Sequence, residues 1–143
     1  MAESVMSAGH LLLLRGDLIL LLRRFNTGYE DGNYSLIAGH VEHGESVLEA
    51  MRREAREEAN IDVCLEELEF SHIMFRRKSD SSVKADFFFK CVKWSGQIEN
   101  IEPHKCDELK WFLLRELPGN TVPYIRAALE HIGGGRAFSE FGW

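Results

Sequence analysis

The sequence predicts one α/β domain, residues 1–143, in which several strands alternate with two helices. Short apolar runs separated by turn residues recur along the chain and indicate strands, and the leucine-rich runs are continuous, as in strands covered on both faces. Two segments, Ser46–Ala59 and Thr121–His131, have apolar residues at helical spacing instead. The length is enough to bury one core, and no repeat or linker divides it.

The first strands are predicted from two apolar runs, Leu11–Leu14 and Leu18–Leu22, on either side of Gly16-Asp17. A Gly-Asp step between apolar runs is typical of a tight hairpin. A polar loop over Asn26–Asn33 follows, and Tyr34–Ala38 is the next predicted strand.

The first helix, predicted over Ser46–Ala59, has a start signal and a stop signal. Ser46 and Glu49 have the S-x-x-E spacing of a capping box. Asn60 follows the last helical residue, and Asn tolerates the left-handed conformation that commonly ends a helix.

The second half of the chain continues the alternation of elements. Glu69–Arg76 and Lys84–Trp94 are predicted strands, Gly96–Asp107 is an irregular acidic loop, and Leu109–Leu113 is a further strand. The second helix follows a Leu-Pro stop. The tail, Arg136–Trp143, carries three aromatic residues that we expect either to dock on the domain or to form a dimer surface.

Composition excludes several classes of protein. Apolar residues at 45% and charged residues at 28% are ordinary globular values, and a net charge of −6 argues against binding duplex nucleic acid. Three widely spaced cysteines form no C-x-x-C pair, so neither a disulfide framework nor a thiolate zinc site is indicated. No apolar run is long enough to span a membrane, and the first residues lack the basic cluster of a secretion signal. We therefore expect a cytoplasmic protein.

The helix over Ser46–Ala59 breaks its own amphipathic pattern. Glu54 and Glu58 fall in the middle of its apolar face and Glu57 lies at the edge. Burying these carboxylates is costly unless a cation neutralises them. Two interpretations are open: a solvated acidic helix with salt bridges to Arg53, or a site for a divalent cation. Oxygen-only ligands would favour Mg²⁺ or Mn²⁺ over Zn²⁺.

The spacing around this helix resembles the Nudix box, G-x5-E-x7-R-E-U-x-E-E-x-G-U, where U is an aliphatic residue. Gly39 opens the motif, Glu45 follows after five residues, and Arg53 begins the charged run after seven more. Every charged position matches. Asn60 stands where the family has Gly, and Ile37-Ala38 replaces the more usual Pro-Gly. The resemblance covers the whole chain and implies the Nudix α/β/α sandwich, in which a mixed β-sheet is flanked by the box helix and a C-terminal helix.

The resemblance implies a hydrolase that cuts a diphosphate linkage in a nucleoside diphosphate joined to another group. It implies that Glu54, Glu57 and Glu58 are ligands of divalent cations, with the carbonyl oxygen of Ala38 as a fourth. Arg53 would then orient Glu57 through a salt bridge. Two further box positions have structural roles in this interpretation: Gly39 lets the loop approach the helix, and Glu45 supports the loop and helix geometry.

The general base differs among Nudix members, being a box Glu in some and a Glu from a late loop in others. Asn100-Ile101-Glu102-Pro103-His104-Lys105-Cys106 is similar to an N-x-E-P-x-K-C segment of MutT-like members that hydrolyse nucleoside triphosphates. Glu102 is therefore the late-loop candidate. Lys105 is expected either to bind phosphate or to pair with Glu102. The box over 39–61 and the segment 99–108 each carry a net charge of −3, which together equal the whole excess.

Substrate contacts are expected from the end of the second strand and from aromatic residues. Arg23 and Arg24 are candidates for phosphate contact, and strand alternation points one of them inward, with Arg24 preferred. Candidates for a base pocket, for which an ordinary core or surface position is an equally open interpretation, are Tyr29, Tyr34, His72, Phe87 and Phe89.

The expected reaction is Mg²⁺-dependent hydrolysis of a nucleoside triphosphate to a nucleoside monophosphate and pyrophosphate. The alternative within the family is another nucleoside diphosphate conjugate: a nucleotide sugar, a dinucleoside polyphosphate or a capped RNA end. A non-catalytic nucleotide-binding module is the alternative from another class. The expected partner is a small nucleotide, without a membrane and with a homodimer as a further option.

Overall fold

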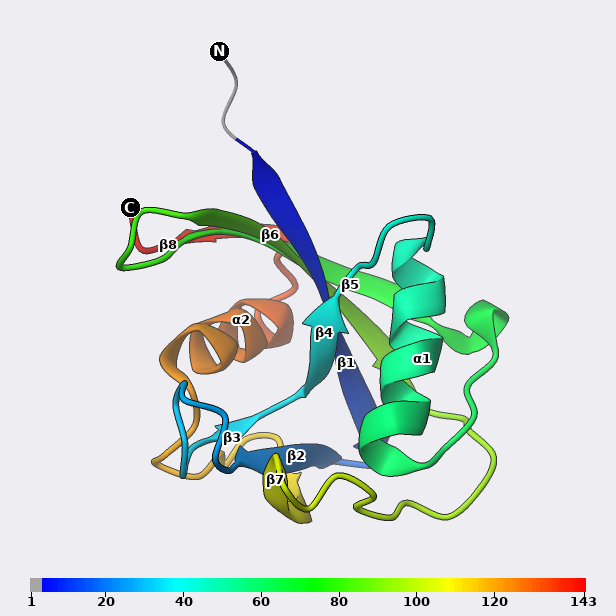
Figure 1. Ribbon diagram of the computed structural model, residues 1–143. Coiled ribbons are helices and arrows are strands. Elements are labelled where there is room, and N and C mark those ends of the chain that lie inside the picture. The colour runs from blue at the N-terminus through cyan, green and yellow to red at the C-terminus, as the bar shows by residue number, and fades with distance from the viewer. Residues whose placement is uncertain (1–3) are drawn as a thin grey trace.

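The computed structural model describes residues 4–143, and it places a helix on each side of a system of mixed strands (Figure 1). The predicted α/β architecture is confirmed. The strands are β1 (Val5–Arg15), β2 (Leu18–Arg24), β3 (Tyr34–Ser35), β4 (Ile37–His40), β5 (Glu69–Arg77), β6 (Val83–Cys91), β7 (Cys106–Leu113) and β8 (Phe138–Phe141). The helices are α1 (Val47–Ala59), α2 (Pro123–Gly133) and a short 3-10 turn, η1 (Leu65–Glu67).

Strand β1 is central because it takes part in two sheets. Its residues 5–13 pair in parallel with β6 and its residues 8–11 pair antiparallel with β4, whereas its last residues form the predicted hairpin with β2. The larger sheet has the order β4-β1-β6-β5-β8, and the smaller one has the order β3-β2-β7. The two sheets therefore meet along β1, and β4 lies beside it at the edge of the larger sheet.

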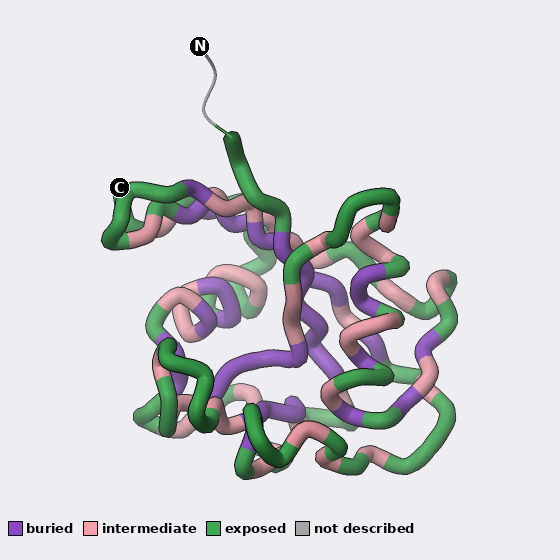
Figure 2. The backbone as a smooth tube through the Cα atoms, viewed as in Figure 1, coloured by how far each residue is buried: buried purple, intermediate pink, exposed green. Residues whose placement is uncertain are grey.

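Both faces of β1 are covered, as the continuous leucines predict. Leu11 and Leu13 belong to a core cluster with Met51 of α1, whereas Leu12, between them, packs in a second cluster with Ile125 of α2. Successive side chains of a strand point to opposite faces, so this alternation gives each helix its own core. Buried backbone runs through the strands between the two helices (Figure 2).

Helix α1 has the two caps that its sequence predicts. Ser46 Oγ accepts a hydrogen bond from the Glu49 N–H at 3.1 Å, and the Glu49 carboxylate accepts one from the Ser46 N–H at 3.4 Å. Asn60 ends the helix in the left-handed region at φ 59° and ψ 32°. The departure from Gly in the box therefore keeps the conformation that the position requires.

Replacing Asn60 with Ala is expected to lower the free energy of unfolding by about 1 kcal/mol, because a Cβ without a local hydrogen bond is unfavourable in this conformation. Replacing it with Gly is the matched control, since Gly adopts positive φ without strain. Urea denaturation of the three proteins measures the difference. An Ala variant as stable as the Gly variant would contradict the role of this cap.

Several element boundaries differ from the expectation. The strand expected over Tyr34–Ala38 is two strands, because β3 pairs with β2 of the smaller sheet while β4 pairs with β1 of the larger one. Leu36, between them, is buried where the chain crosses from one sheet to the other. Strand β7 begins at Cys106, inside the expected acidic loop, because Cys106 pairs with Arg24 across a bulge in β2.

The tail docks on the domain as a strand. Strand β8 runs parallel to β5 at the edge of the larger sheet, and the Trp143 indole N–H donates a hydrogen bond to the Phe75 carbonyl oxygen at 3.1 Å. Phe138 and Trp143 nevertheless keep more than half of their surface exposed. Trp143 also stacks on Phe75, and Phe141 packs against the second core, so the tail docks through aromatic side chains as well as through its main chain.

All three cysteines of the chain lie within residues 4–143. Cys64 is exposed and Cys91 and Cys106 are buried, and all three are free thiols. Over the same residues, neither helix has the length and apolar character needed to cross a membrane.

Candidate active site

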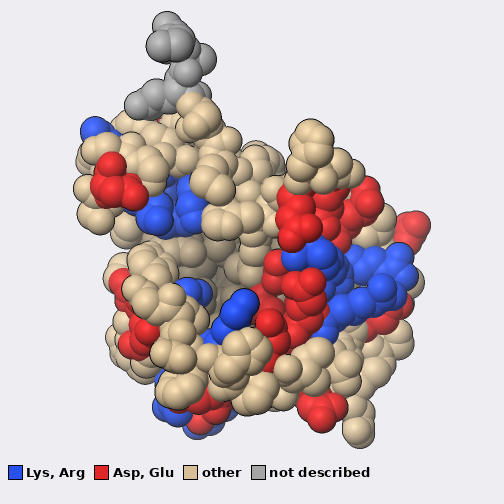
Figure 3. All heavy atoms as spheres, viewed as in Figure 1, with Lys and Arg blue, Asp and Glu red and all other residues tan. Residues whose placement is uncertain are grey.

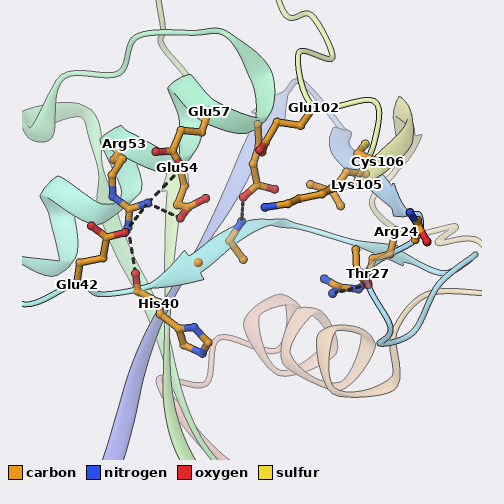
Figure 4. Close-up of a pocket in the computed structure, with 15 residues that line it drawn as sticks. Arg24, Thr27, His40, Glu42, Arg53, Glu54, Glu57, Glu102, Lys105 and Cys106 are labelled. Atoms are coloured by element: carbon orange, nitrogen blue, oxygen red, sulfur yellow. Dashed lines mark hydrogen bonds and ion pairs between the residues drawn. The ribbon is translucent and has the colours of Figure 1, made fainter.

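A cleft of about 650 Å³ opens between α1, β4 and the loop that precedes β7 (Figure 4). Most of the residues singled out from the sequence line it. The lining consists of Leu22, Arg24, Asn26, Thr27, Ala38, Gly39, His40, Glu42, Arg53, Glu54, Glu57, Glu58, Glu102, Lys105 and Cys106.

One wall of the cleft is acidic and comes from α1. Glu54, Glu57 and Glu58 reach it together because residues three and four apart share a helix face. Glu54 is 12% exposed, whereas Glu57 is 51% exposed at the rim. Burial raises the pKa of Glu58 well above its ordinary value, and the neighbouring Glu54 carboxylate raises it further. The carboxylates of Glu54 and Glu58 therefore lie close together where little water reaches them, and a bound cation would reduce their repulsion.

Arg53 organises these carboxylates. Its guanidinium binds Glu45 through two hydrogen bonds of 2.8 and 3.0 Å, and a further N–H donates to Glu54 at 2.7 Å. The predicted salt bridge to Glu57 is present but longer, at 3.3 Å. The bond to Glu45 raises the pKa of Arg53 and lowers that of Glu45. The guanidinium therefore ties the loop before α1 to the acidic face of the helix.

Strand β4 passes close to this face. The Ala38 N–H donates a hydrogen bond to Glu58 Oε1 at 3.2 Å. A Cβ added to Gly39 would lie 2.0 Å from Glu54 Oε1 and 2.3 Å from its carboxyl carbon. The expected reason for glycine at this position, close approach of loop and helix, therefore agrees with the geometry.

Replacing Gly39 with Ala is expected to lower the catalytic rate by at least about ten-fold while changing the melting temperature little. The added methyl group must displace the Glu54 carboxylate, which is the end of a flexible side chain and can move at low energetic cost. Steady-state rates and thermal melting measure the two effects. Gly119→Ala is the matched control, because an added Cβ there meets nothing within 4 Å. An unaltered rate in Gly39→Ala would contradict the interpretation.

The opposite wall carries positive charge. Lys105 extends from the loop before β7 toward the α1 face, and Arg24 lies at the end of β2 (Figure 4). Arg24 is held by the Tyr29 carbonyl oxygen at 2.6 Å and by Thr27 Oγ1 at 3.1 Å. Arg23 points elsewhere and pairs with Asp107 at 2.7 Å, so strand alternation separates the two arginines as expected.

Of the four acids in the segment 99–108, Glu102 is the one that lines the cleft. Asp107 is occupied by Arg23, and Glu108 accepts a hydrogen bond from the Tyr34 hydroxyl. In the part of the chain that the structure describes, the Lys105 ammonium forms no ion pair with the Glu102 carboxylate. The two residues are joined by their main chains instead, because the backbone N–H of Lys105 donates to the carbonyl oxygen of Glu102 at 2.9 Å.

None of the aromatic residues suggested for a base pocket lines the cleft. Phe87 and Phe89 pack in the core beneath α1, because their odd positions on β6 face that helix. Tyr34 belongs to the other core, and His72 is fully buried against Ser139. Tyr29 is 42% exposed and stands beside Arg24, 5.2 Å from the guanidinium carbon to the ring centroid.

A family comparison decides the identity of the fold. The NUDIX domain model matches residues 4–132. The chain belongs to the NUDIX family. The matched range includes the cleft, both core clusters and most of α2, so the Nudix resemblance of the box is confirmed over nearly the whole chain.

Curated relatives of this Nudix chain carry one name. It is 33% identical over 122 residues to the "NAD-capped RNA hydrolase NudC" of Pseudomonas aeruginosa, which covers 85% of the chain and 40% of that protein. It is 46% identical over 52 residues to the NudC of Stutzerimonas stutzeri, covering 36% of the chain and 18% of that protein. The Nudix chain thus spans at most about 40% of the length of these relatives.

Two of the solved structures that this chain resembles are MutT proteins. A MutT NUDIX hydrolase from Burkholderia pseudomallei superimposes with a TM-score of 0.81 at 26% identity, covering 90% of the chain and 98% of that structure. A MutT protein from Methanosarcina mazei superimposes with a TM-score of 0.79 at 18% identity, covering 94% and 96%, and shows likeness of fold. The family and these hydrolase names support the prediction of a Nudix-type pyrophosphohydrolase.

Nudix hydrolases generally use divalent metal ions, and the donor chemistry of the cleft fits one. Three carboxylates and a backbone carbonyl supply oxygen ligands of the kind that hard cations prefer. Among residues 4–143, no three His, Cys, Asp or Glu side chains are gathered around one point as they stand. Glu54 and Glu57 are bonded to Arg53 instead. To bind a metal ion, Glu54 and Glu57 would therefore have to release Arg53.

Sequence reasoning overlooked several residues of the cleft. Thr27, His40 and Glu42 line the cleft, although none of them is among the site residues expected from the sequence. Asp31 accepts hydrogen bonds from the N–H groups of Thr27 and Gly28, which fixes the loop that carries Thr27 and Tyr29. The signal available was the proximity of Thr27 to Arg24 in sequence, since the loop that follows Arg24 at the end of β2 borders the same cleft.

Proposed function

We propose that this Nudix chain is a divalent-cation-dependent hydrolase that cleaves a diphosphate linkage in a small nucleotide. A nucleoside triphosphate is the first candidate substrate, giving a nucleoside monophosphate and pyrophosphate. The observation that carries the proposal is the cleft itself, in which three carboxylates of α1 face Lys105 and Arg24. Such a cleft suits a polyanion that brings a cation with it.

The acidic wall would hold the cation. Glu54, Glu57 and Glu58 are the proposed ligands, with the Ala38 carbonyl oxygen as a fourth. Mg²⁺ is the proposed ion, with Mn²⁺ as a substitute, because all four donors are oxygen atoms. When bound, the ion supplies positive charge that neutralises phosphate oxygens and makes the phosphorus more open to attack.

The chain's own residues supply the remaining chemistry. Lys105 and Arg24 neutralise phosphate oxygens on the other wall, while Arg53 and Glu45 hold the acidic face in place. A water oxygen bonds to phosphorus, the bridging P–O bond breaks, and the proton of the water passes to a carboxylate. Glu102 and the box glutamates are the candidate bases, because they line the same cleft.

A second candidate substrate is favoured by the relatives. The NudC proteins are named as NAD-capped RNA hydrolases, so a dinucleotide or a capped RNA end is the alternative substrate for this chain. Its diphosphate joins two nucleosides, and its cleavage gives two monophosphates rather than pyrophosphate. The same cleft suits either substrate, because the diphosphate is the part that it would hold.

A panel of nucleotides incubated with Mg²⁺, with products identified by mass, separates these candidates. Pyrophosphate and a nucleoside monophosphate from one triphosphate would support the first candidate. AMP and nicotinamide mononucleotide from NAD would support the second. Absence of cleavage with every triphosphate, dinucleotide, nucleotide sugar and capped RNA would overturn the hydrolase proposal and favour a nucleotide-binding module.

The proposal also covers the cellular compartment, the domain organisation and the oligomeric state of the protein. Three free thiols suit a cytoplasmic protein, and residues 1–143 are proposed to act as one domain. Homodimerisation through the exposed Phe138 and Trp143 is checked by light scattering, for which a monomer mass would be the contrary result.

A further inference from the structure

A second pocket, of about 270 Å³, adjoins the cleft and has the opposite charge. It shares Arg24, Ala38, Gly39 and His40 with the cleft, so one molecule can reach both. We call it the basic pocket, and it is lined by Ala8, His10, Arg24, Tyr29, Ala38, Gly39, His40, Arg76, Lys78, Lys84 and Tyr124. Figure 3 shows a hollow on this face with acidic atoms on one side and basic atoms on the other.

The basic pocket carries a concentration of charge that the rest of the chain does not explain. Four basic side chains and no acidic one line it, in a protein with a net charge of −6. Asp86 is buried behind the lining, where its carboxylate pairs with the Arg76 guanidinium at 2.7 Å and with His10 Nε2 at 3.0 Å. Within residues 4–143, Lys78, Lys84 and Arg24 have no ion-pair partner.

The Asp86 carboxylate offsets only part of the positive charge of this arrangement. Arg76 of β5 and Lys84 of β6 are direct partners in the strand register, a position where like charges destabilise a sheet. Burial and the charges of Lys78 and Arg76 lower the pKa of Lys84. Its ammonium group donates to neutral His40 at 2.8 Å rather than to a carboxylate.

Two further residues of the lining bear on its chemistry, Tyr29 and His10. Tyr29 lies between two of them, with the Arg24 guanidinium carbon 5.2 Å and the Lys78 ammonium nitrogen 5.6 Å from its ring centroid. His10 is 2% exposed, and its Nδ1 has no hydrogen-bond partner among the described residues. The pocket therefore holds one polar atom, His10 Nδ1, to which no described residue forms a hydrogen bond, beside cations that lack carboxylate partners.

We propose that the basic pocket binds a phosphate group of the substrate other than the two phosphates joined by the linkage that is cleaved. This inference rests on the proposed function, since the linkage itself lies at the acidic cleft. A phosphate carries nearly two negative charges and several acceptor oxygens, which match three cations without ion-pair partners. The substrate class is then a nucleotide with a third phosphate, in the chain or on a sugar hydroxyl.

Binding of inorganic pyrophosphate in EDTA tests the pocket without testing catalysis. Without a divalent cation the acidic wall repels phosphate, so calorimetry reports the basic side. Lys84→Met and Lys78→Met are each expected to weaken binding about ten-fold or more. Lys93→Met, which removes the same charge at an exposed site, is the matched control. The proposal that this pocket binds phosphate would be overturned if the wild type did not bind pyrophosphate, or if all four proteins bound it equally.

Substrate pairs that differ by one phosphate test whether that phosphate belongs to the substrate. The pairs are ATP with ADP, and NADPH with NADH. Both lysine variants are expected to lower kcat/KM about ten-fold more for the member with the extra phosphate. An equal loss within both pairs, with pyrophosphate binding in EDTA intact, would overturn the inference and indicate a site for a free anion. Failure of every substrate to react would overturn the proposed function, whereas the binding result stands by itself.

Discussion

Replacing Glu57 with Gln is expected to lower kcat by about 10²–10⁴-fold, while the fold is retained. The amide has the size of the carboxylate but neither its charge nor its basicity, and such groups contribute effects of this size in metal-assisted hydrolysis. Glu57 is half-exposed at the rim of the cleft and holds no core contact. Product formation with Mg²⁺ measures the rate, and thermal melting checks the fold.

Glu66→Gln is the matched control for this variant, because Glu66 is an exposed glutamate on η1 outside the cleft. Its rate is expected to equal that of the wild type. If Glu57→Gln retained the full rate, the acidic wall would not be catalytic. If the two variants lost activity equally, the effect would reflect total charge rather than position.

The second large effect is expected in stability. Replacing Asp86 with Asn should lower the free energy of unfolding by about 3–5 kcal/mol, because the Arg76 guanidinium would keep its burial and lose its counter-charge. Asp86 is fully buried, Arg76 is 5% exposed, and their closest atoms are 2.7 Å apart. Urea denaturation measures the change.

Asp62→Asn is the control, since Asp62 pairs with Arg52 and Arg56 on the exposed side of α1. Surface pairs of this kind contribute about 0–1 kcal/mol, so the control is expected to be nearly neutral. Equal destabilisation by the two substitutions would show that burial of the Asp86 pair has no special weight.

The same carboxylate gives stability a dependence on acid pH. Burial alone would raise the pKa of Asp86, but the hydrogen bond from His10 and the charge of Arg76 outweigh it and bring the pKa to about 2. This stabilisation is complete above the ordinary pKa of 3.8 and is lost as the pH falls toward 2. It amounts to about 2 kcal/mol. The free energy of unfolding is measured by urea denaturation from pH 5 to 2 for the wild type and for Asp86→Asn. The difference between the two proteins should become smaller as the pH falls. A difference that stays constant would contradict this role of Asp86.

Local sequence signals account for much of the fold. The capping box at Ser46, the left-handed stop at Asn60 and the turn at Gly16 depend on neighbours in sequence, and each is present in the structure. The acidic wall was also predictable, because helix periodicity alone brings Glu54 and Glu58 to one face.

Features that depend on distant pairing were not predictable. The break at Leu36 follows from β3 and β4 joining different sheets, and the aromatic residues Phe87 and Phe89 face α1 because of the register of β6. The basic pocket arises where Arg76 and Lys84 meet across two strands. In sequence these residues are an ordinary polar turn and its flanks, so their shared charge becomes visible only when the strands are paired.

Hydrolysis of one triphosphate in H₂¹⁸O, by the wild type and Glu57→Gln in parallel, is the most direct test of the central claim that the α1 cleft cleaves a diphosphate linkage. The account predicts pyrophosphate and nucleoside monophosphate from the wild type with Mg²⁺. One of the two products should carry a single ¹⁸O, and formation of both should nearly cease with EDTA or in the variant. Cleavage that proceeds equally in the variant, or no cleavage of any triphosphate or dinucleotide by the wild type, would contradict it.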